Sequence, residues 1–109
     1  MTLVLVVDDS PVDRRLAGGL LEKRDDFSVE YAENGNDALK KIEQQVPDVV
    51  VTDLQMPEMN GLELVGFIRS AHPLVPVILM TAHGSEDIAV EALEQGASSY
   101  VPKSKLADS

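Results

Sequence analysis

Short apolar runs alternate with segments of helical periodicity along the whole chain. Five runs that are rich in β-branched residues or alternate in polarity predict β-strands, at residues 3–7, 27–32, 48–52, 75–80 and 98–101. Between them, apolar residues that recur every three or four positions predict four helices, at about 11–24, 38–46, 61–72 and 86–95. This alternation predicts an α/β protein with a parallel sheet covered by helices on both faces.

Turn and capping residues mark the expected ends of these elements. Ser10-Pro11 predicts the start of the first helix, and Ser85 predicts the cap of the fourth. Asn34-Gly35 predicts a turn before the second helix, and Gly96 predicts the end of the fourth. Right-handed crossovers with short connections then favour a doubly wound, flavodoxin-like sheet of five strands in the order 2-1-3-4-5.

The segment 103–109 resembles the beginning of a helix that the chain does not complete. We therefore expect the last helix of the fold to be truncated or absent. The sequence contains no internal repeat, low-complexity segment or linker. Residues 1–109 are thus expected to form one domain, the N-terminal part of a longer protein.

Composition limits the classes of function that fit the chain. The net charge is −10, and an acidic surface repels nucleic-acid phosphate. No apolar run approaches the roughly 18–20 residues that a membrane-spanning helix needs. The absence of cysteine excludes disulfides and thiolate metal sites. We expect a cytoplasmic domain that binds neither nucleic acid nor membrane.

Three acids lie at the ends of two strands that the expected topology makes neighbours. Asp8 and Asp9 follow the first strand, and Asp53 follows the third. Sites in doubly wound sheets form at the carboxyl ends of the strands, where the winding reverses, and adjacent strands lie about 4.8 Å apart. The sequence therefore predicts one acidic pocket, which Thr81 and Lys103 face from the ends of the fourth and fifth strands.

The three carboxylates of this pocket would repel one another, and a bound divalent cation would make their ionisation favourable. Because all the available side-chain ligands are oxygens, the pocket predicts Mg²⁺ or the similar Mn²⁺, with the backbone carbonyl of Gln55 as a further ligand. A carboxylate in such a site can itself become an acyl phosphate, and Asp53 is the best candidate. Lys103 would neutralise a phosphoryl oxygen, and Thr81 would donate a hydrogen bond to one.

Four blocks of the sequence resemble the receiver domain of two-component response regulators: VLVVDDSP, VVVTDLQMPEMNGLEL, VPVILMTAHG and GASSYVPKS. They follow the order and spacing of that family and span essentially the whole chain. The resemblance implies a phosphorylation-dependent signalling switch, not an enzyme beyond its own phosphotransfer and autodephosphorylation. It implies a histidine kinase or histidine phosphotransfer protein as phosphoryl donor. It also allows a C-terminal output domain and a phosphorylation-dependent dimer.

The resemblance also implies a role for each matching residue. These are Asp53 as phospho-acceptor, Asp8 and Asp9 as the acidic pair for Mg²⁺, Thr81 as switch hydroxyl, Lys103 as phosphate-binding lysine and Tyr100 as switch aromatic. Gln55 and His83, two residues past Asp53 and Thr81, would border the path of the attacking water and set the lifetime of the phosphoryl group. The output face would be formed by the fourth strand, the fourth helix and the fifth strand.

One position departs from the family pattern, in which a proline joined by a cis peptide follows the phosphate-binding lysine. Here Pro102 precedes Lys103, and Ser104 follows it. A cis peptide before a residue other than proline costs about 2.5–4 kcal/mol. Either the Lys103–Ser104 peptide stores that strain or the loop differs from the pattern.

Three other interpretations of such a fold remain to be weighed. A protein-interaction scaffold would keep the receiver fold without being phosphorylated. An aspartate-nucleophile phosphatase of the haloacid dehalogenase type would carry a second acid two positions after its nucleophile, whereas here Ser10-Pro11 follows the adjacent acids. A flavodoxin-like cofactor binder would need a phosphate-binding loop rich in Ser, Thr or Gly after the first strand, where the acids of this chain would repel phosphate.

Overall fold

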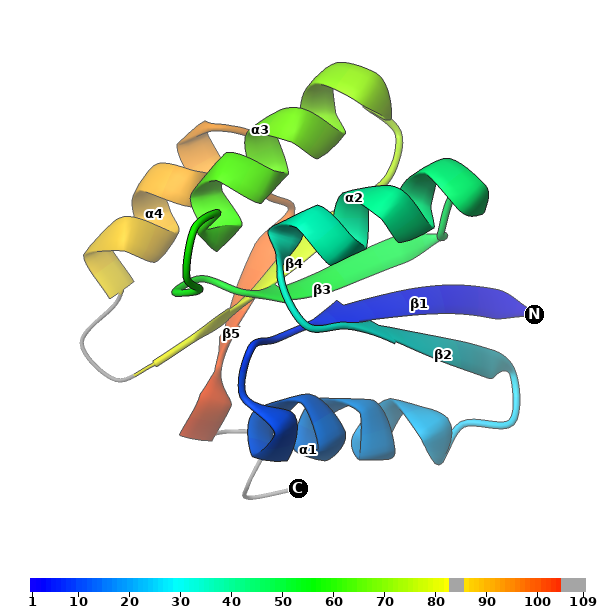
Figure 1. Cartoon of the computed structure of the whole chain (residues 1–109). Coiled ribbons are helices and arrows are strands. Elements are labelled where there is room, and N and C mark those ends of the chain that lie inside the picture. The colour runs from blue at the N-terminus through cyan, green and yellow to red at the C-terminus, as the bar shows by residue number, and fades with distance from the viewer. Residues whose placement is uncertain (83–85, 105–109) are drawn as a thin grey trace.

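The computed structural model describes residues 1–82 and 86–104 of the chain, and nine elements alternate along them (Figure 1). The strands are β1 (Thr2–Val7), β2 (Phe27–Ala32), β3 (Val49–Asp53), β4 (Val77–Thr81) and β5 (Ser99–Pro102). The helices are α1 (Pro11–Glu22), α2 (Gly35–Gln44), α3 (Gly61–Ala71) and α4 (Glu86–Glu94). Within this described part of the chain, no helix combines the length and the apolar character needed to cross a membrane.

The five strands pair in parallel in one sheet of order β2-β1-β3-β4-β5, which confirms the predicted doubly wound fold. Because β1 lies between β2 and β3, the winding reverses between β1 and β3. At the end of β1, Val7 is in register with Ala32 of β2 and with Thr52 of β3. The carboxyl ends of β1 and β3 therefore lie side by side.

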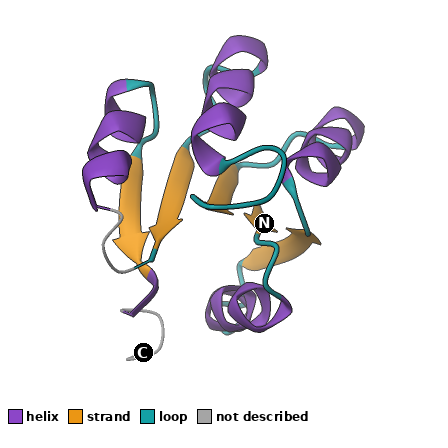
Figure 2. Cartoon of the chain, turned by 60° about the vertical axis from the view of Figure 1, so that its left-hand side comes forward, coloured by secondary structure: helices purple, strands orange, loops and turns teal. Residues whose placement is uncertain are grey.

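Helices cover both faces of the sheet, with α2, α3 and α4 on one face and α1 on the other (Figures 1 and 2). The larger core, on the first of these faces, includes Leu5, Val7, Ile42, Leu64, Ile68 and Leu79, and the smaller core consists of Val4, Val6, Ala17 and Met80. Successive residues of β1 thus enter opposite cores. This is why the sequence of β1 is a continuous apolar run instead of an alternating one.

The start of α1 and the end of α4 agree with the capping residues in the sequence. The side chain of Ser10 accepts a hydrogen bond from the Asp13 N–H at 3.3 Å, and Pro11 is the first helical residue. Gly96 follows α4 with a φ of 119°, a conformation that favours glycine. Ser85, the predicted cap of α4, lies outside the described residues.

Two predicted boundaries are corrected by the structure. Asn34 is a helix cap and not part of a separate turn, because its side chain accepts a hydrogen bond from the Asp37 N–H at 2.7 Å and α2 begins directly at Gly35. The fourth strand begins at Val77, two residues later than expected. Pro76 has no N–H to donate to the ladder of hydrogen bonds, so regular pairing starts after it.

The structure describes only the beginning of the fifth helix of the expected fold. After β5, Lys103 and Ser104 are helical, and they are the last residues that the structure describes. On that face of the sheet, α1 is therefore the one helix within the described ranges. Three valines that pack against the smaller core, Val49, Val51 and Val101, are only partly buried.

The loop between β3 and α3 returns closely to the end of β3. The Gly61 N–H donates a hydrogen bond to the Leu54 carbonyl at 2.7 Å, and the Leu54 N–H donates to the Met80 carbonyl at 3.1 Å. A Cβ atom on Gly61 would lie 2.5 Å from the carbonyl oxygen of Asp53 and 2.8 Å from the Cα of Leu54. Both are backbone atoms that cannot rotate away, so this approach of α3 to the strand end requires glycine.

Replacing Gly61 by alanine should destabilise the fold, whereas the same change at Gly66 in α3 should stabilise it. The new Cβ at Gly61 would overlap backbone atoms, at a cost of about 1–3 kcal/mol. At Gly66 the new Cβ would meet no described atom within 4 Å beyond its own helix backbone and chain neighbours, so alanine should gain about 0.5–1 kcal/mol from helix propensity. Urea unfolding measures both changes. Unaltered stability in Gly61→Ala would contradict the close approach.

Candidate functional site

Three carboxylates meet at the carboxyl ends of β1 and β3. Asp8, Asp9 and Asp53 each offer one oxygen, and these three oxygens all lie within 4.8 Å of one another. Asp8 is fully buried, Asp53 is 5% exposed, and Asp9 is exposed to solvent. The structure thus brings together the acids that the sequence analysis singled out. We refer to these three residues as the acidic cluster.

Hydrogen bonds from two neighbouring segments hold Asp8 in place. The Asp8 N–H donates to the Ala32 carbonyl at 3.1 Å, and its Oδ1 accepts a hydrogen bond from the Ser10 N–H at 2.9 Å. Arg14, in the first turns of α1, donates from Nη1 to the Asp8 carbonyl at 2.8 Å. The second carboxylate oxygen, Oδ2, is buried and accepts no hydrogen bond from the described residues. Its neighbour is the ammonium group of Lys103, at 3.1 Å as an ion pair.

The ammonium group of Lys103 enters the acidic cluster from the end of β5. Its Nζ lies 2.9 Å from Oδ2 of Asp13, 3.1 Å from Oδ2 of Asp8 and 3.3 Å from Oδ1 of Asp53. The Lys103–Ser104 peptide is trans. Of the two alternatives posed by the sequence, the loop after the lysine therefore differs from the family pattern.

The charges around the acidic cluster shift two pKa values. Burial, and then the negative charge of Asp8, raise the pKa of Asp53 to about 6, although the Lys103 ammonium opposes this rise. Burial lowers the pKa of Lys103, but contacts with Asp13, Asp8 and Asp53 outweigh burial and leave the pKa raised. Lys103 therefore stays charged at neutral pH, while Asp53 ionises less readily than an ordinary aspartate.

Thr81 and Tyr100, the two residues with expected switch roles, lie on one face of the sheet. Thr81 ends β4 and is buried, and its Oγ1 has no hydrogen-bond partner among the residues described. The register pairs Thr81 with Pro102 and Leu79 with Tyr100, so these side chains project to the same side. Tyr100 is half-buried against the larger core. The hydroxyl of Thr81, unpaired among the described residues, and the half-buried ring of Tyr100 therefore lie on the same face of the sheet, the face that α4 covers.

The loop after Asp53 forms the outer rim of the site. Gln55 is exposed on this loop, and Glu58 adopts a φ of 68°, which residues other than glycine rarely do. Beside the acidic cluster, a cleft is lined by Asp9, Glu33, Asn34, Pro57 and Glu58. His83, the second residue expected to tune the phosphoryl lifetime, lies outside the described residues.

The residues of the acidic cluster fit a hard divalent cation. Their donor atoms are all oxygens, which Mg²⁺ and Mn²⁺ prefer. Oδ2 of Asp8 is buried and has no hydrogen bond from the described residues, only the ion pair with Lys103, so a cation would give it a further ligand bond. Because Asp9 faces solvent, water can complete the coordination. The cluster can therefore hold a metal ion.

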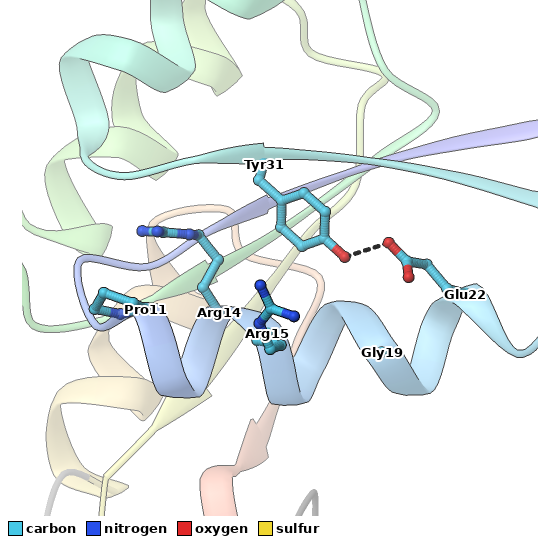
Figure 3. Close-up of a pocket in the computed structure, with 6 residues that line it drawn as sticks. All are labelled: Pro11, Arg14, Arg15, Gly19, Glu22 and Tyr31. Atoms are coloured by element: carbon cyan, nitrogen blue, oxygen red, sulfur yellow. Dashed lines mark hydrogen bonds between the residues drawn. The ribbon is translucent and has the colours of Figure 1, made fainter.

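A separate pocket lies along α1 and β2 (Figure 3). It is lined by Pro11, Arg14, Arg15, Gly19, Glu22 and Tyr31. The hydroxyl of Tyr31 donates a hydrogen bond to Glu22, and its ring occupies the space over Gly18 where a Cβ would lie. This pocket contains none of the three clustered acids, so the candidate site is the acidic cluster and not this pocket.

Relatives of known identity match the whole chain. Residues 4–108 match the family described as response regulator receiver domain. The chain is 42% identical over 106 residues to the DNA-binding transcriptional regulator NtrC of Salmonella typhimurium, covering 93% of this chain and 21% of NtrC. It is 36% identical over 108 residues to the chemotaxis protein CheY of Listeria monocytogenes, covering 99% of this chain and 91% of CheY. The chain thus spans about a fifth of NtrC and most of CheY.

Solved receiver structures share the fold. A response regulator receiver domain protein from Clostridium thermocellum has a TM-score of 0.87 and 31% identity, covering 94% of this chain and 82% of that one. The receiver domain of NtrX from Brucella abortus also has a TM-score of 0.87, with 29% identity and coverage of 95% and 91%.

A doubly wound sheet with an acidic cluster and a lysine at its switch point places the chain in the class of flavodoxin-like α/β domains whose site lies at the carboxyl ends of the strands. Within that class, the chain belongs to the response regulator receiver domain family, as its four sequence blocks indicated. Members of this family act as signalling domains and not primarily as enzymes.

Two residues that the sequence analysis did not single out contact Lys103 or the acidic cluster. Asp13 pairs with Lys103, and Arg14 donates to the Asp8 carbonyl. Both lie at the start of α1, which turns back toward the end of β1. The available signal was the cap at Ser10, because it begins the helix directly beside the acids and brings the first turn over them.

Because folding raises the pKa of Asp53, ionisation of Asp53 should destabilise the metal-free fold. The Asp53 carboxyl has a pKa of about 6 in the folded state and 3.8 in the unfolded chain, so the folded state binds its proton more tightly. The free energy of unfolding should therefore fall as pH rises from 3.8 to about 6. Replacing Asp53 by asparagine should then stabilise the protein by about 3 kcal/mol near neutral pH and by about half that at about pH 5. Urea unfolding in EDTA at the two pH values measures this. A gain independent of pH would contradict the raised pKa.

Proposed function

We propose that this chain is a signalling switch in which Asp53 accepts a phosphoryl group from a phosphohistidine. The observation that carries the proposal is the position of Asp53, a buried carboxylate within 4.8 Å of two further acids and 3.3 Å from an ammonium group. An oxygen of Asp53 attacks the phosphorus atom, and the P–N bond breaks as the P–O bond forms. The electron pair stays on the imidazole nitrogen, which takes up a proton.

The acidic cluster is the proposed site of Mg²⁺ or Mn²⁺, with the backbone carbonyl of Gln55 as a further ligand. When bound, the ion would neutralise charge on the phosphoryl oxygens and on the clustered carboxylates. Lys103 holds another phosphoryl oxygen through its ammonium group, which stays charged because its pKa is raised. Lys103, which lowers the pKa of Asp53, and the cation would together let Asp53 react as a carboxylate despite its burial.

Thr81 and Tyr100 are the proposed switch residues. The phosphoryl group adds about 1.5–2 negative charges and three acceptor oxygens. The Oγ1 of Thr81, which is buried without a partner in the described chain, donates to one of these oxygens as Thr81 moves toward it. Tyr100 rotates into the space that Thr81 vacates. The population shifts between two packings of the output face formed by β4, α4 and β5.

Hydrolysis returns the switch to its starting state. A water molecule attacks the phosphorus atom, the P–O bond to Asp53 breaks, and inorganic phosphate leaves the regenerated carboxylate. Gln55 is exposed on the loop after Asp53 and is proposed to border the path of this water, together with His83. Their side chains would set the lifetime of the phosphoryl group.

The wider protein is proposed by analogy with the relatives. NtrC is a DNA-binding transcriptional regulator of which this chain spans about a fifth, so we propose that residues 1–109 are an N-terminal receiver domain followed by an output domain. The donor would be a histidine kinase or a histidine phosphotransfer protein. Phosphorylation-dependent dimerisation would use the output face. The acidic surface argues against direct nucleic-acid binding by this domain, and the lack of cysteine suits the cytoplasm.

Incubation with acetyl phosphate and Mg²⁺ should add one phosphoryl group to the chain. Intact-mass measurement should find this adduct on the unaltered protein and not on Asp53→Ala, because the alanine has no oxygen to attack phosphorus. An adduct that persists in Asp53→Ala would exclude Asp53 as the acceptor. If the unaltered chain also stays unmodified, the alternative of an unphosphorylated scaffold is favoured.

Replacing Asp9 by asparagine should weaken Mg²⁺ binding by about tenfold, because one of three clustered charges is lost at short range. Glu33→Gln is the matched control, since Glu33 is exposed and lines the cleft beside Asp9 without belonging to the acidic cluster. Titration calorimetry with MgCl₂ measures both affinities. Equal losses in the two variants would mean that general surface charge, and not coordination by Asp9, attracts the ion.

A further inference from the structure

Lys103 has a carboxylate partner outside the acidic cluster. Its Nζ lies 2.9 Å from Oδ2 of Asp13, closer than to Asp8 at 3.1 Å or to Asp53 at 3.3 Å. The contact with Asp13 is also a hydrogen bond, in which the ammonium group donates. Lys103 and Asp13 are 90 positions apart in the sequence. The contact therefore joins α1 to the end of β5.

The start of α1 holds Asp13 in a defined position. The Asp13 N–H donates to the side chain of Ser10, which caps the helix, and Pro11 restricts the backbone of the first turn. The Asp13 side chain is 39% exposed, whereas those of Asp8 and Asp53 are 0% and 7% exposed. Asp13 is thus a partly solvated carboxylate at the edge of the site.

Lys103 lies at the edge of the sheet, and its ammonium group has three carboxylate neighbours. β5 is the edge strand of the sheet, so it pairs with a neighbour on one side only, and Lys103 comes directly after it. An ammonium group has three N–H donors, and three carboxylates surround this one. The position of the charge therefore depends on those carboxylates more than on the strand.

Occupation of the site would remove two of these partners. A cation at the acidic cluster draws on the oxygens of Asp8 and Asp53, and a phosphoryl group would be attached to Asp53 itself. Asp13 does not belong to the cluster, so it remains available to the lysine in every state. It is also the one carboxylate contact of Lys103 that lies on α1.

We propose that Asp13 is a positioning residue that holds the Lys103 ammonium at the phosphoryl site while the acidic cluster is occupied. This inference rests on the proposed function, since it concerns the group that Lys103 is to hold. Asp13 does not touch the phosphoryl group. It limits the positions that the lysine can adopt and so lowers the entropic cost of engaging the phosphoryl oxygens.

The test compares Asp13→Asn with Asp37→Asn. Asp37 occupies the same position in the first turn of α2, where the Asn34 side chain caps it, but it has no contact with Lys103. Both changes remove one first-turn carboxylate, so helix-end electrostatics are matched. The probe is beryllofluoride, a phosphoryl analogue, titrated into the Mg²⁺-loaded chain by calorimetry.

Asp13→Asn should weaken beryllofluoride binding by about tenfold, which corresponds to losing one charge-assisted hydrogen bond. Mg²⁺ affinity measured without beryllofluoride should change by about twofold or less, and Asp37→Asn should bind beryllofluoride as the unaltered chain does. Asp13→Glu should recover part of the loss. Equal beryllofluoride affinity in Asp13→Asn and the unaltered chain, or an equal loss in Asp37→Asn, would overturn the inference.

A second measurement follows the lysine directly. Acetylation with an N-hydroxysuccinimide ester, read residue by residue by mass spectrometry, should be faster at Lys103 in Asp13→Asn and unchanged at exposed Lys23. An unchanged rate at Lys103 would show that Asp13 does not restrain it. If the unaltered chain binds no beryllofluoride at all, the proposed function fails and this inference fails with it. The other outcomes concern Asp13 alone.

Discussion

Two carboxylates buried at the ends of neighbouring strands are the constraint on which the rest of this structure depends. Asp8 and Asp53 are both almost inaccessible to water, so solvent cannot screen their repulsion. One ammonium group, that of Lys103, serves both of them. Since β4 lies between β3 and β5, the lysine must reach past the end of β4, where the side chain of Thr81 is small. The residues at the ends of β1, β3, β4 and β5 must therefore all suit the position of this one ammonium group.

The fold supplies this arrangement by general rules of chain packing. A parallel sheet directs all its carboxyl ends to one edge, and the reversal of winding leaves the ends of β1 and β3 open to a ligand. The loop after Asp53 must then leave the end of β3 without covering the site between β1 and β3. Gly61 allows this, because α3 can begin almost in contact with the backbone of the strand. The cap at Ser10 likewise lets α1 begin close to the end of β1, beside Asp8.

How far the sequence predicts this structure depends on the range of the interactions involved. Strands β1, β3 and β4 have largely apolar runs and β2 alternates in polarity, so the sequence pattern predicts the strands, and handedness rules lead from them to the strand order. The predicted starts of α2 and β4 are wrong by a few residues. The start of α2 depends on the hydrogen bond that caps it at Asn34, and the start of β4 at Val77 depends on the missing N–H of the proline before it. The sequence analysis does not place Asp13 in the site, because its partner is 90 positions away and the Ser10 cap indicates only where the first turn of α1 lies, not what it contacts. The roles of the site residues remain predictions.

The three clustered acids differ in burial, and this difference supports distinct roles for them. Asp8 is fully enclosed, with one carboxylate oxygen and its backbone engaged in hydrogen bonds and the other oxygen paired with Lys103, so it is poorly placed to receive a phosphoryl group. Asp9 is exposed to solvent, so its carboxylate remains hydrated. Asp53 lies between these extremes, buried enough for its pKa to rise to about 6 yet adjacent to the ammonium group of Lys103. Burial and the charge of Asp8 disfavour its ionised form, and conversion to an acyl phosphate would move charge from the buried carboxylate to oxygens that a bound metal ion and Lys103 could reach.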